Sequence, residues 1–442
     1  MPNLHLQEAR DAVLRAALAH VDHREPLLLL EAPPGSGKTH VLVRLAILAR
    51  HRQERVAVVT QTNAQADDVA RRLATEFPSV GVHRFLASTA DDVELGASVT
   101  CIRREKDLPT GPSIVVATGA KWSTLRALGD FDLALVDEAW QMKWADFTLL
   151  GRVAARFVLI GDPGQIAPTV TIRTERWETA RRPPHRAAPE VIRHDDTLPF
   201  AVHQLPVSTR LPHDTVELVR AFYDFEFASW SASGERRLLP GRATRRSPYD
   251  RAIDRLRDAT VACLTLRTPD EGPPAEEDLE LTSAVAALMR RLLERKTRFV
   301  TEDGEDDLRA EHVGITATHR VMNARITEAL GDLAEHVRVD TPERWQGLER
   351  PVMIAVHPLS SVTDPSPFDL DTGRLCVMTS RHRVGLILVT RDHVGRTLDE
   401  HLPSAEQPVS QPDLVGRGHE RHRAAWKWLM DNERVIALGG SK

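Results

Sequence analysis

Short apolar runs alternate with segments of helical periodicity from residue 27 to about residue 170. A short apolar run between turns is typical of a buried strand, and a 3.6-residue period is typical of an amphipathic helix. The predicted strands are residues 27–30, 56–60, 81–86, 114–117, 133–136 and 157–160, with helices between most of them, such as 40–51 and 64–76. This alternation indicates an α/β domain, in which helices cover a parallel sheet.

A poorly periodic stretch rich in proline and arginine follows at residues 172–198, and then the alternation resumes. Helices are predicted at 213–222, 280–295 and 321–330, and strands at 260–266, 312–315, 352–356 and 386–390. We therefore expect two α/β domains: residues 1–200, and residues 201–442 with a C-terminal helical tail.

Amino-acid composition bears on the class of protein and on its cellular compartment. The chain has 442 residues, 42% of them hydrophobic and 27% charged, as in globular proteins. No apolar stretch approaches the roughly 20 residues that cross a bilayer, and the three cysteines are far apart. We expect a cytoplasmic protein with no membrane association. The net charge of −5 does not indicate nucleic-acid binding, although a local basic groove would be enough to bind a nucleic acid.

A glycine-bearing loop joins the first predicted strand to the next predicted helix. It has the sequence pattern of a phosphate-binding loop and comprises Pro34, Gly35, Ser36, Gly37, Lys38 and Thr39. Its backbone N–H groups and the helix N-terminus would surround a nucleotide's phosphates. Lys38 would neutralise the β- and γ-phosphates, and the Thr39 hydroxyl would bind Mg²⁺. The predicted cofactors are ATP and Mg²⁺.

Two later strands end in residues suited to nucleotide hydrolysis. Asp137 and Glu138 directly follow the strand at 133–136, and Gln165 lies in the turn after the strand at 157–160. Asp137 would hold Mg²⁺, and Glu138 would act as general base on the attacking water. The Gln165 amide would sense the γ-phosphate. A kinase has no use for a second carboxylate in this role, so the pair favours an ATP hydrolase.

Together these segments resemble the motifs of superfamily 1 helicases. The similarity covers about residues 25–395 and follows the DEAxQ-box, up-frameshift-like branch (superfamily 1B), in a compact form with short insertions. The segments that match, in the family's order, are 32–39 (motif I), 60–67 (Ia), 115–119 (Ic), 137–141 (II), 161–168 (III), 341–349 (V) and 376–383 (VI). The resemblance implies two tandem RecA-like domains with parallel sheets and an ATP cleft between them.

The resemblance also assigns residues around the nucleotide. Arg210 and Arg381 would reach the γ-phosphate and join Glu138 and Gln165 as catalytic residues. Glu349 falls where the family's carboxylate binds the ribose. Gln7 is a candidate to read the adenine edge, although its spacing to Ala12 and Val13 differs from the family's.

Motifs Ia, Ic and V imply contacts with a single strand of nucleic acid. The residues at the family's positions are Thr60, Asn63, Thr118, Thr341 and Gln346. Trp122 follows motif Ic and is either a base-stacking residue or part of the core.

The resulting hypothesis is an ATP-dependent helicase or translocase that moves 5′ to 3′ on single-stranded DNA or RNA. The alternative is a regulatory ATPase switch or motor subunit in a multiprotein defence or repair complex, without unwinding activity of its own. A metabolite kinase is disfavoured by Glu138 and by the distant Arg381 motif.

Overall fold

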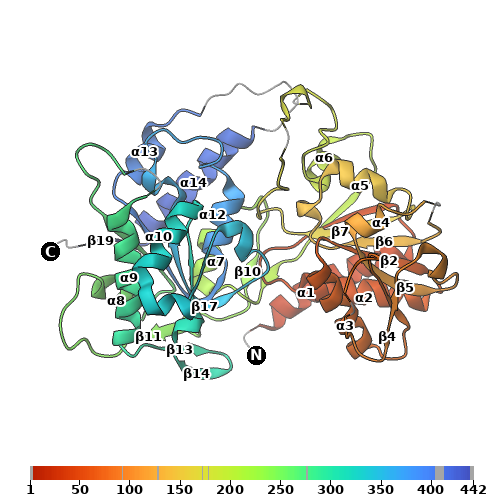
Figure 1. Ribbon diagram of the computed structural model, residues 1–442, viewed down its shortest axis with the longest axis horizontal. Coiled ribbons are helices and arrows are strands. Elements are labelled where there is room, and N and C mark those ends of the chain that lie inside the picture. The colour runs from red at the N-terminus through yellow and green to blue at the C-terminus, as the bar shows by residue number, and fades with distance from the viewer. Residues whose placement is uncertain are drawn as a thin grey trace. The chain divides into compact units, whose positions relative to one another are not determined.

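The computed structural model describes residues 3–91, 93–126, 129–171, 173–177, 179–274, 277–403 and 413–438. The chain folds into two compact units (Figure 1). The first comprises residues 3–163 and 167–207, and the second comprises residues 164–166 and the chain from Ser208 onward. No helix in the described part of the chain is both long and apolar enough to cross a membrane.

The first unit is built on an eight-stranded sheet with the order β4-β3-β5-β2-β6-β7-β1-β8. All of its recorded strand pairs are parallel. The strands are β1 (Leu27–Glu31), β2 (Arg55–Thr60), β3 (Val82–Phe85), β4 (Val99–Ile102), β5 (Ser113–Thr118), β6 (Leu133–Val136), β7 (Phe157–Gly161) and β8 (Ala201–Gln204). The helices are α1 (Leu4–Asp22), α2 (Lys38–His51), α3 (Asn63–Glu76), α4 (Gly119–Trp122), α5 (Trp144–Leu150) and α6 (Ala188–His194).

Helices cover both faces of this sheet, which explains why its strands read as continuous apolar runs. Successive strand residues point to opposite faces of the sheet, so each strand contributes side chains to two hydrophobic cores. Leu28 and Leu30 pack in one core with residues of α1, α2 and α3. Leu29 packs in the other with residues of α4, α5 and α6.

The second unit contains a six-stranded sheet with the order β16-β15-β17-β18-β12-β19, and all of its strand pairs are parallel. Its strands are β12 (Val261–Leu266), β15 (Val313–Thr316), β16 (Arg338–Asp340), β17 (Arg350–Val356), β18 (His382–Arg391) and β19 (Val435–Ala437). Its helices are α7 (His213–Arg220), α8 (Asp250–Arg255), α9 (Leu279–Glu294), α10 (Arg320–Leu330), α11 (Pro342–Trp345), α12 (Thr372–Thr379), α13 (Val394–Glu400) and α14 (Leu414–Asp431).

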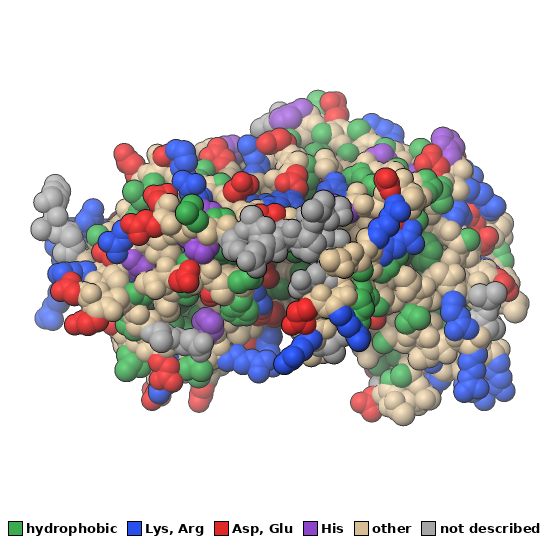
Figure 2. Space-filling model, turned by 90° about the horizontal axis from the view of Figure 1, so that it is seen from above, with side chains coloured by type: hydrophobic (Ala, Val, Ile, Leu, Met, Phe, Trp, Pro, Cys, Tyr) green, Lys and Arg blue, Asp and Glu red, His purple; other side chains and the backbone are tan. Residues whose placement is uncertain are grey.

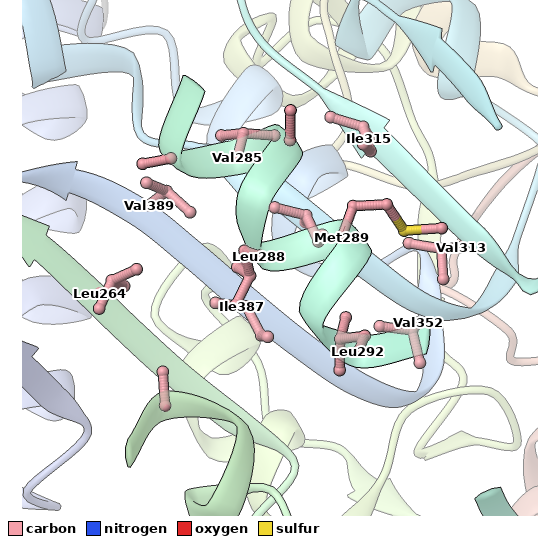
Figure 3. Close-up of a cluster of buried hydrophobic side chains, with 14 of the residues drawn as sticks. Leu264, Val285, Leu288, Met289, Leu292, Val313, Ile315, Val352, Ile387 and Val389 are labelled. Atoms are coloured by element: carbon pink, nitrogen blue, oxygen red, sulfur yellow. The ribbon is translucent and has the colours of Figure 1, made fainter. Parts of the chain in front are cut away.

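Helix α9 supplies much of one core of this second unit. Figure 3 shows Val285, Leu288, Met289 and Leu292 of α9 against side chains of the sheet, including Ile387 of β18. Helices α7, α12 and α14 contribute to the core on the other face. A small antiparallel sheet, in the order β11-β13-β14, accompanies the main one and consists of β11 (Arg237–Leu239), β13 (Arg298–Thr301) and β14 (Gly304–Asp307).

The two units share one strand order. The order β2-β6-β7-β1-β8 in the first corresponds to β15-β17-β18-β12-β19 in the second. In both sheets, the first strand along the chain is followed by a helix and then by a strand that lies three positions away in the sheet. Two strands that come later in the chain occupy the positions between them. This topology makes the protein α/β with two RecA-like parallel-sheet units. The alternation along the sequence predicts the α/β class, and the family resemblance implies the RecA-like domains.

Two features of the fold differ from the predicted elements. Strand β8 pairs with β1, so the predicted boundary at residue 200 falls before the last strand of the first sheet. Several strands of three or four residues were not predicted, because most of their residues are exposed or only partly buried: β4, β8, β11, β13, β14, β16 and β19. Residues 172 and 178 of the Pro- and Arg-rich stretch, and residues 1, 2 and 439–442 at the ends of the predicted domains, lie outside the described residues.

Candidate nucleotide-binding site

The glycine-bearing loop lies between β1 and α2, at the carboxyl end of the first sheet. Ala32 N–H donates to the Gly161 carbonyl (2.9 Å), which ties the start of the loop to β7. Gly35 and Gly37 have φ values of 70° and 85°. Side chains are strained in this left-handed region, so glycine at both positions shapes the loop.

The loop has the chemistry of an anion site. Gly37 precedes the first residue of α2, a 14-residue helix whose free N–H groups begin here. The Ser36 hydroxyl is buried and has no hydrogen-bond partner among the described residues. Buried hydroxyls are almost always paired, so a phosphate oxygen would satisfy this one. These residues therefore fit a bound nucleoside phosphate.

Asp137 and Glu138 follow β6, and only β7 lies between β6 and β1 in the sheet. Lys38 Nζ lies 3.0 Å from Glu138 Oε1 and 3.2 Å from Oε2, so the loop lysine and this carboxylate form an ion pair. Glu138 N–H donates to Asp137 Oδ1 (3.0 Å). Lys38, Asp137 and Glu138 thus lie together, as predicted for one hydrolytic site.

The backbone of Glu138 is in the left-handed region, with φ 50° and ψ 45°. Such a conformation in a residue other than glycine costs of order 1–3 kcal/mol and is common at functional sites. Two neighbours hold the turn. Gln61 Nε2 donates to the carbonyls of Asp137 (3.3 Å) and Glu138 (3.5 Å). A Cβ on Gly161 would lie 2.7 Å from Trp140 Cε3, so the turn packs directly on β7.

Asp137 is only 6% exposed. Burial, reinforced by the neighbouring Glu138 carboxylate, raises the pKa of Asp137 to about 7. Lys38 opposes this shift. A divalent cation beside Asp137 would favour its ionised form. Asp137 and the partly exposed Thr39 thus have the oxygen ligands that Mg²⁺ prefers.

The first unit places the predicted nucleic-acid contacts in different environments. Asn63 is exposed, and its Oδ1 accepts from Arg84 Nη2 (2.8 Å). Thr118 is partly exposed, and its hydroxyl accepts from Lys121 N–H at the start of α4. Both can still present polar atoms to solvent.

Trp122 and Thr60 require correction. Trp122 is 1% exposed, its Nε1 donates to the Val58 carbonyl (3.0 Å), and its ring packs edge-on against Phe85 and Phe131. No ring face is left for a base, so Trp122 is a core residue. Thr60 is fully buried, and its hydroxyl donates to the Thr62 carbonyl (3.1 Å). Its hydroxyl stabilises the turn and is closed to a ligand.

Gln7 lies in α1, and its Nε2 donates to Asp11 Oδ1 (2.8 Å) one helical turn away. This is an ordinary side-chain contact within a helix.

The second unit gathers Arg210 and Glu349. Arg210 Nε donates to Glu349 Oε2 (2.6 Å), and Arg383 Nη1 lies 3.8 Å from Glu349 Oε1. Thr341 and Gln346 flank the short helix α11 and are partly exposed. Gly347, with φ 77°, turns the chain between Gln346 and Glu349.

Arg381 and Gln165 also belong to the second unit. Arg381 lies between α12 and β18 and is 1% exposed. Its carbonyl accepts from Arg350 N–H (2.9 Å), which fixes its backbone. Gln165 is flanked by closely packed residues, since a Cβ on Gly164 would lie 2.4 Å from Tyr223 Cζ.

Gln61 and Arg84 are supporting residues that the sequence did not reveal. Gln61 holds the Asp137–Glu138 turn, and Arg84 holds Asn63 together with Asp67, to which its Nε donates (2.8 Å). The position of Gln61, directly after a buried strand, was the only available signal for its role.

The match to a protein family lies in the first unit. Residues 10–203 match the model of an AAA domain family. The match supports a nucleotide-binding domain over this region, which contains the phosphate-binding loop. A search of the curated proteins gave no match.

Among solved structures, the chain is similar to the PRRSV helicase, with 15% identity over 87% of this chain and 55% of that one, and a TM-score of 0.42. It is also similar to the helicase nonstructural protein 10 of an arterivirus, with 16% identity over 88% and 63% of the two chains, and a TM-score of 0.44. The chain thus spans only 55% and 63% of these helicases.

Proposed function

We propose that this protein hydrolyses ATP and uses the cycle to move along a single strand of nucleic acid, as a helicase or translocase of superfamily 1. The grouping of Lys38, Asp137 and Glu138 at the end of the first sheet carries the proposal. The phosphate-binding loop serves many ATPases, but a buried aspartate next to a glutamate paired with the loop lysine suits hydrolysis in particular.

Each residue has a distinct task in this scheme. Bound MgATP would supply the γ-phosphoryl group to be transferred. Lys38 and the loop N–H groups would bind its phosphates, and Thr39 and Asp137 would bind the cation. Glu138 would leave Lys38 and accept a proton from the attacking water at its carboxylate.

Residues of the second unit would complete the hydrolytic site. The guanidinium groups of Arg210 and Arg381 would stabilise the charge that spreads over the transferred phosphoryl group. Gln165 would sense the γ-phosphate, and Glu349 would bind the ribose once Arg210 turns to the phosphate. A requirement for both units would couple hydrolysis to their movement.

Asn63, Thr118, Thr341 and Gln346 are the proposed contacts to a single strand of DNA or RNA. Such contacts are directed at the backbone, so binding would not depend on base sequence. The likeness of the motifs to the DEAxQ-box branch favours 5′ to 3′ movement.

Steady-state ATP hydrolysis, measured with and without single-stranded DNA and RNA, tests the proposal. We expect strong stimulation by the strand. We expect Lys38→Ala and Glu138→Gln to lose activity by at least about 100-fold, and Glu138→Gln to keep nucleotide binding. Turnover that is indifferent to nucleic acid, or persistence of activity in Glu138→Gln, would contradict it.

One observation favours a second function, a regulatory ATPase switch within a larger complex. Thr60 and Trp122 are closed to nucleic acid, so two of the contacts expected of a motor are missing from the first unit. A switch would hydrolyse ATP at the same site without strand stimulation, and the same assay separates the two functions.

A further inference from the structure

Residues of the segment 229–236 hold the backbone of the loop that carries Arg210. Residues 209–212 join β9 (Val207–Ser208) to α7 and have no regular structure of their own. Arg236 Nη2 donates to the Thr209 carbonyl (2.8 Å), and Arg236 Nη1 donates to the Arg210 carbonyl (2.5 Å). Ser229 Oγ donates to the Leu211 carbonyl (2.7 Å). The path of the loop at Arg210 therefore depends on the position of the Arg236 guanidinium.

Glu302 fixes that guanidinium in turn. Arg236 is 2% exposed, and its Nε and Nη2 donate to Glu302 Oε2 (2.8 Å) and Oε1 (2.6 Å). This is a two-pronged arginine–carboxylate pair, the geometry that best restricts a guanidinium. Although burial alone would raise it, the contact with Arg236 holds the pKa of Glu302 below its ordinary value.

Glu302 lies in the turn between β13 and β14, on the small antiparallel sheet (Figure 1). It also accepts from Arg383 Nη2 (2.9 Å). Arg383 in turn approaches Glu349, and Glu349 accepts from the Arg210 side chain. Together these contacts form a closed ring. The Glu302 carboxylate holds the backbone of Arg210 through Arg236, and it holds the side chain of Arg210 through Arg383 and Glu349.

We infer that Glu302, acting through Arg236, is a positioning residue for Arg210. The inference rests on the proposed function, in which the Arg210 guanidinium acts on the γ-phosphate. Loss of the Glu302 carboxylate would leave the buried Arg236 without its counterion, and the guanidinium would turn away from the two carbonyls. A displacement of about 1 Å at a catalytic group can cost on the order of 100-fold in rate.

The test compares two carboxylates of the same hairpin. Glu305 is a matched control because it also pairs with an arginine, Arg298, but lies outside the ring. We expect Glu302→Ala to lower kcat for strand-stimulated ATP hydrolysis by about 10–100-fold, with KM for ATP within about threefold. Glu305→Ala should stay within about twofold of wild type. A fall of less than fivefold in Glu302→Ala would overturn the inference.

A double-mutant cycle separates positioning from a general structural effect. If Glu302 acts through Arg210, the double variant Arg210→Ala/Glu302→Ala should be no slower than Arg210→Ala alone. If the two losses multiply, Glu302 acts elsewhere and the inference fails. Glu302→Gln keeps an acceptor for Arg236 without the charge, so its kcat should lie between those of wild type and Glu302→Ala.

The controls distinguish this inference from the proposed function. If wild-type turnover does not exceed that of Lys38→Ala, the proposed function fails. If wild-type turnover is normal but Arg210→Ala equals wild type, the ATPase assignment survives while the role of Arg210, and with it that of Glu302, is overturned. Circular dichroism and thermal midpoints of each variant confirm that the compared proteins are folded.

Discussion

Hydrogen bonds of single side chains determine which residues near the site can meet a ligand. Trp122 and Asn63 both follow strands of the first sheet, but the Trp122 indole donates into β2 and Asn63 faces solvent. A buried donor loses its protein partner if it turns outward, and that loss costs about 1–3 kcal/mol. The hydrogen bond therefore commits Trp122 to the core.

Trp122→Phe should accordingly destabilise the protein without weakening strand binding. The change leaves the Val58 carbonyl without the indole N–H, and we expect a cost of about 1–3 kcal/mol and a lower thermal midpoint. Affinity for a fluorescent single-stranded oligonucleotide should stay within about twofold. Trp144→Phe is the control, since its indole has no hydrogen-bond partner among the described residues. A large loss of affinity with an unchanged midpoint would restore Trp122 as a stacking residue.

Sequence could place the residues of the candidate nucleotide site on their elements because spacing and strand context are local. Lys38 begins the helix after β1, and the Asp137–Glu138 pair directly follows β6, as the alternation along the sequence predicts. Thr60 and Trp122 could not be placed in this way, because adjacency to a motif does not tell which face of a strand or short helix a side chain occupies. The pairing of Glu302 with Arg236 could not be predicted for another reason. The two residues are 66 positions apart in the sequence, and only the folded hairpin brings them together.

At the scale of elements, α14 is attached to the second unit through buried histidines. His419 Nε2 contacts the Leu398 carbonyl of α13 (2.7 Å), and the His422 ring lies 5.9 Å from the ring of His357. Burial lowers the pKa of His422 to about 4 and that of His357 well below its ordinary value. These rings are neutral at pH 7, and a proton on either would be costly.

Acid should therefore loosen α14. An unfolded histidine takes up a proton near pH 6.5, but the buried one does not until about pH 4, so stability present above pH 6.5 is lost as the pH falls through this window. Each such histidine contributes up to about 1.4 kcal/mol per pH unit. Hydrogen exchange of α14 between pH 7 and pH 5 measures the effect. His422→Phe should flatten the profile; an unchanged slope would assign the effect to other groups.

At the scale of the whole molecule, overall charge opposes nucleic-acid binding. The net charge is −5, and on the face shown in Figure 2 basic and acidic side chains are interspersed. A strand would therefore need a local site for binding, and only phosphates that pair with Lys or Arg would release counterions there.

We expect a modest but clear salt dependence for the whole protein. If about three phosphates pair with Lys or Arg side chains, the slope of log K against log salt would be roughly −2 for a single strand, whereas the uncharged proposed contacts would add little to it. Fluorescence anisotropy between about 50 and 200 mM salt measures it. A mixed-sequence oligonucleotide and oligo(dT) should give similar slopes, because the proposed contacts read the backbone. Binding that ignores salt, or that strongly prefers one sequence, would argue against this mode.

The left-handed backbone at Glu138 places activity and stability in competition at one position. Glycine would relieve the backbone strain, although it would also remove the ion pair with Lys38. A chain under selection for folding alone would have no need of a carboxylate in this strained conformation at residue 138. The persistence or loss of this glutamate among descendants of the protein would thus record whether hydrolysis was still under selection, independently of whether the fold had survived.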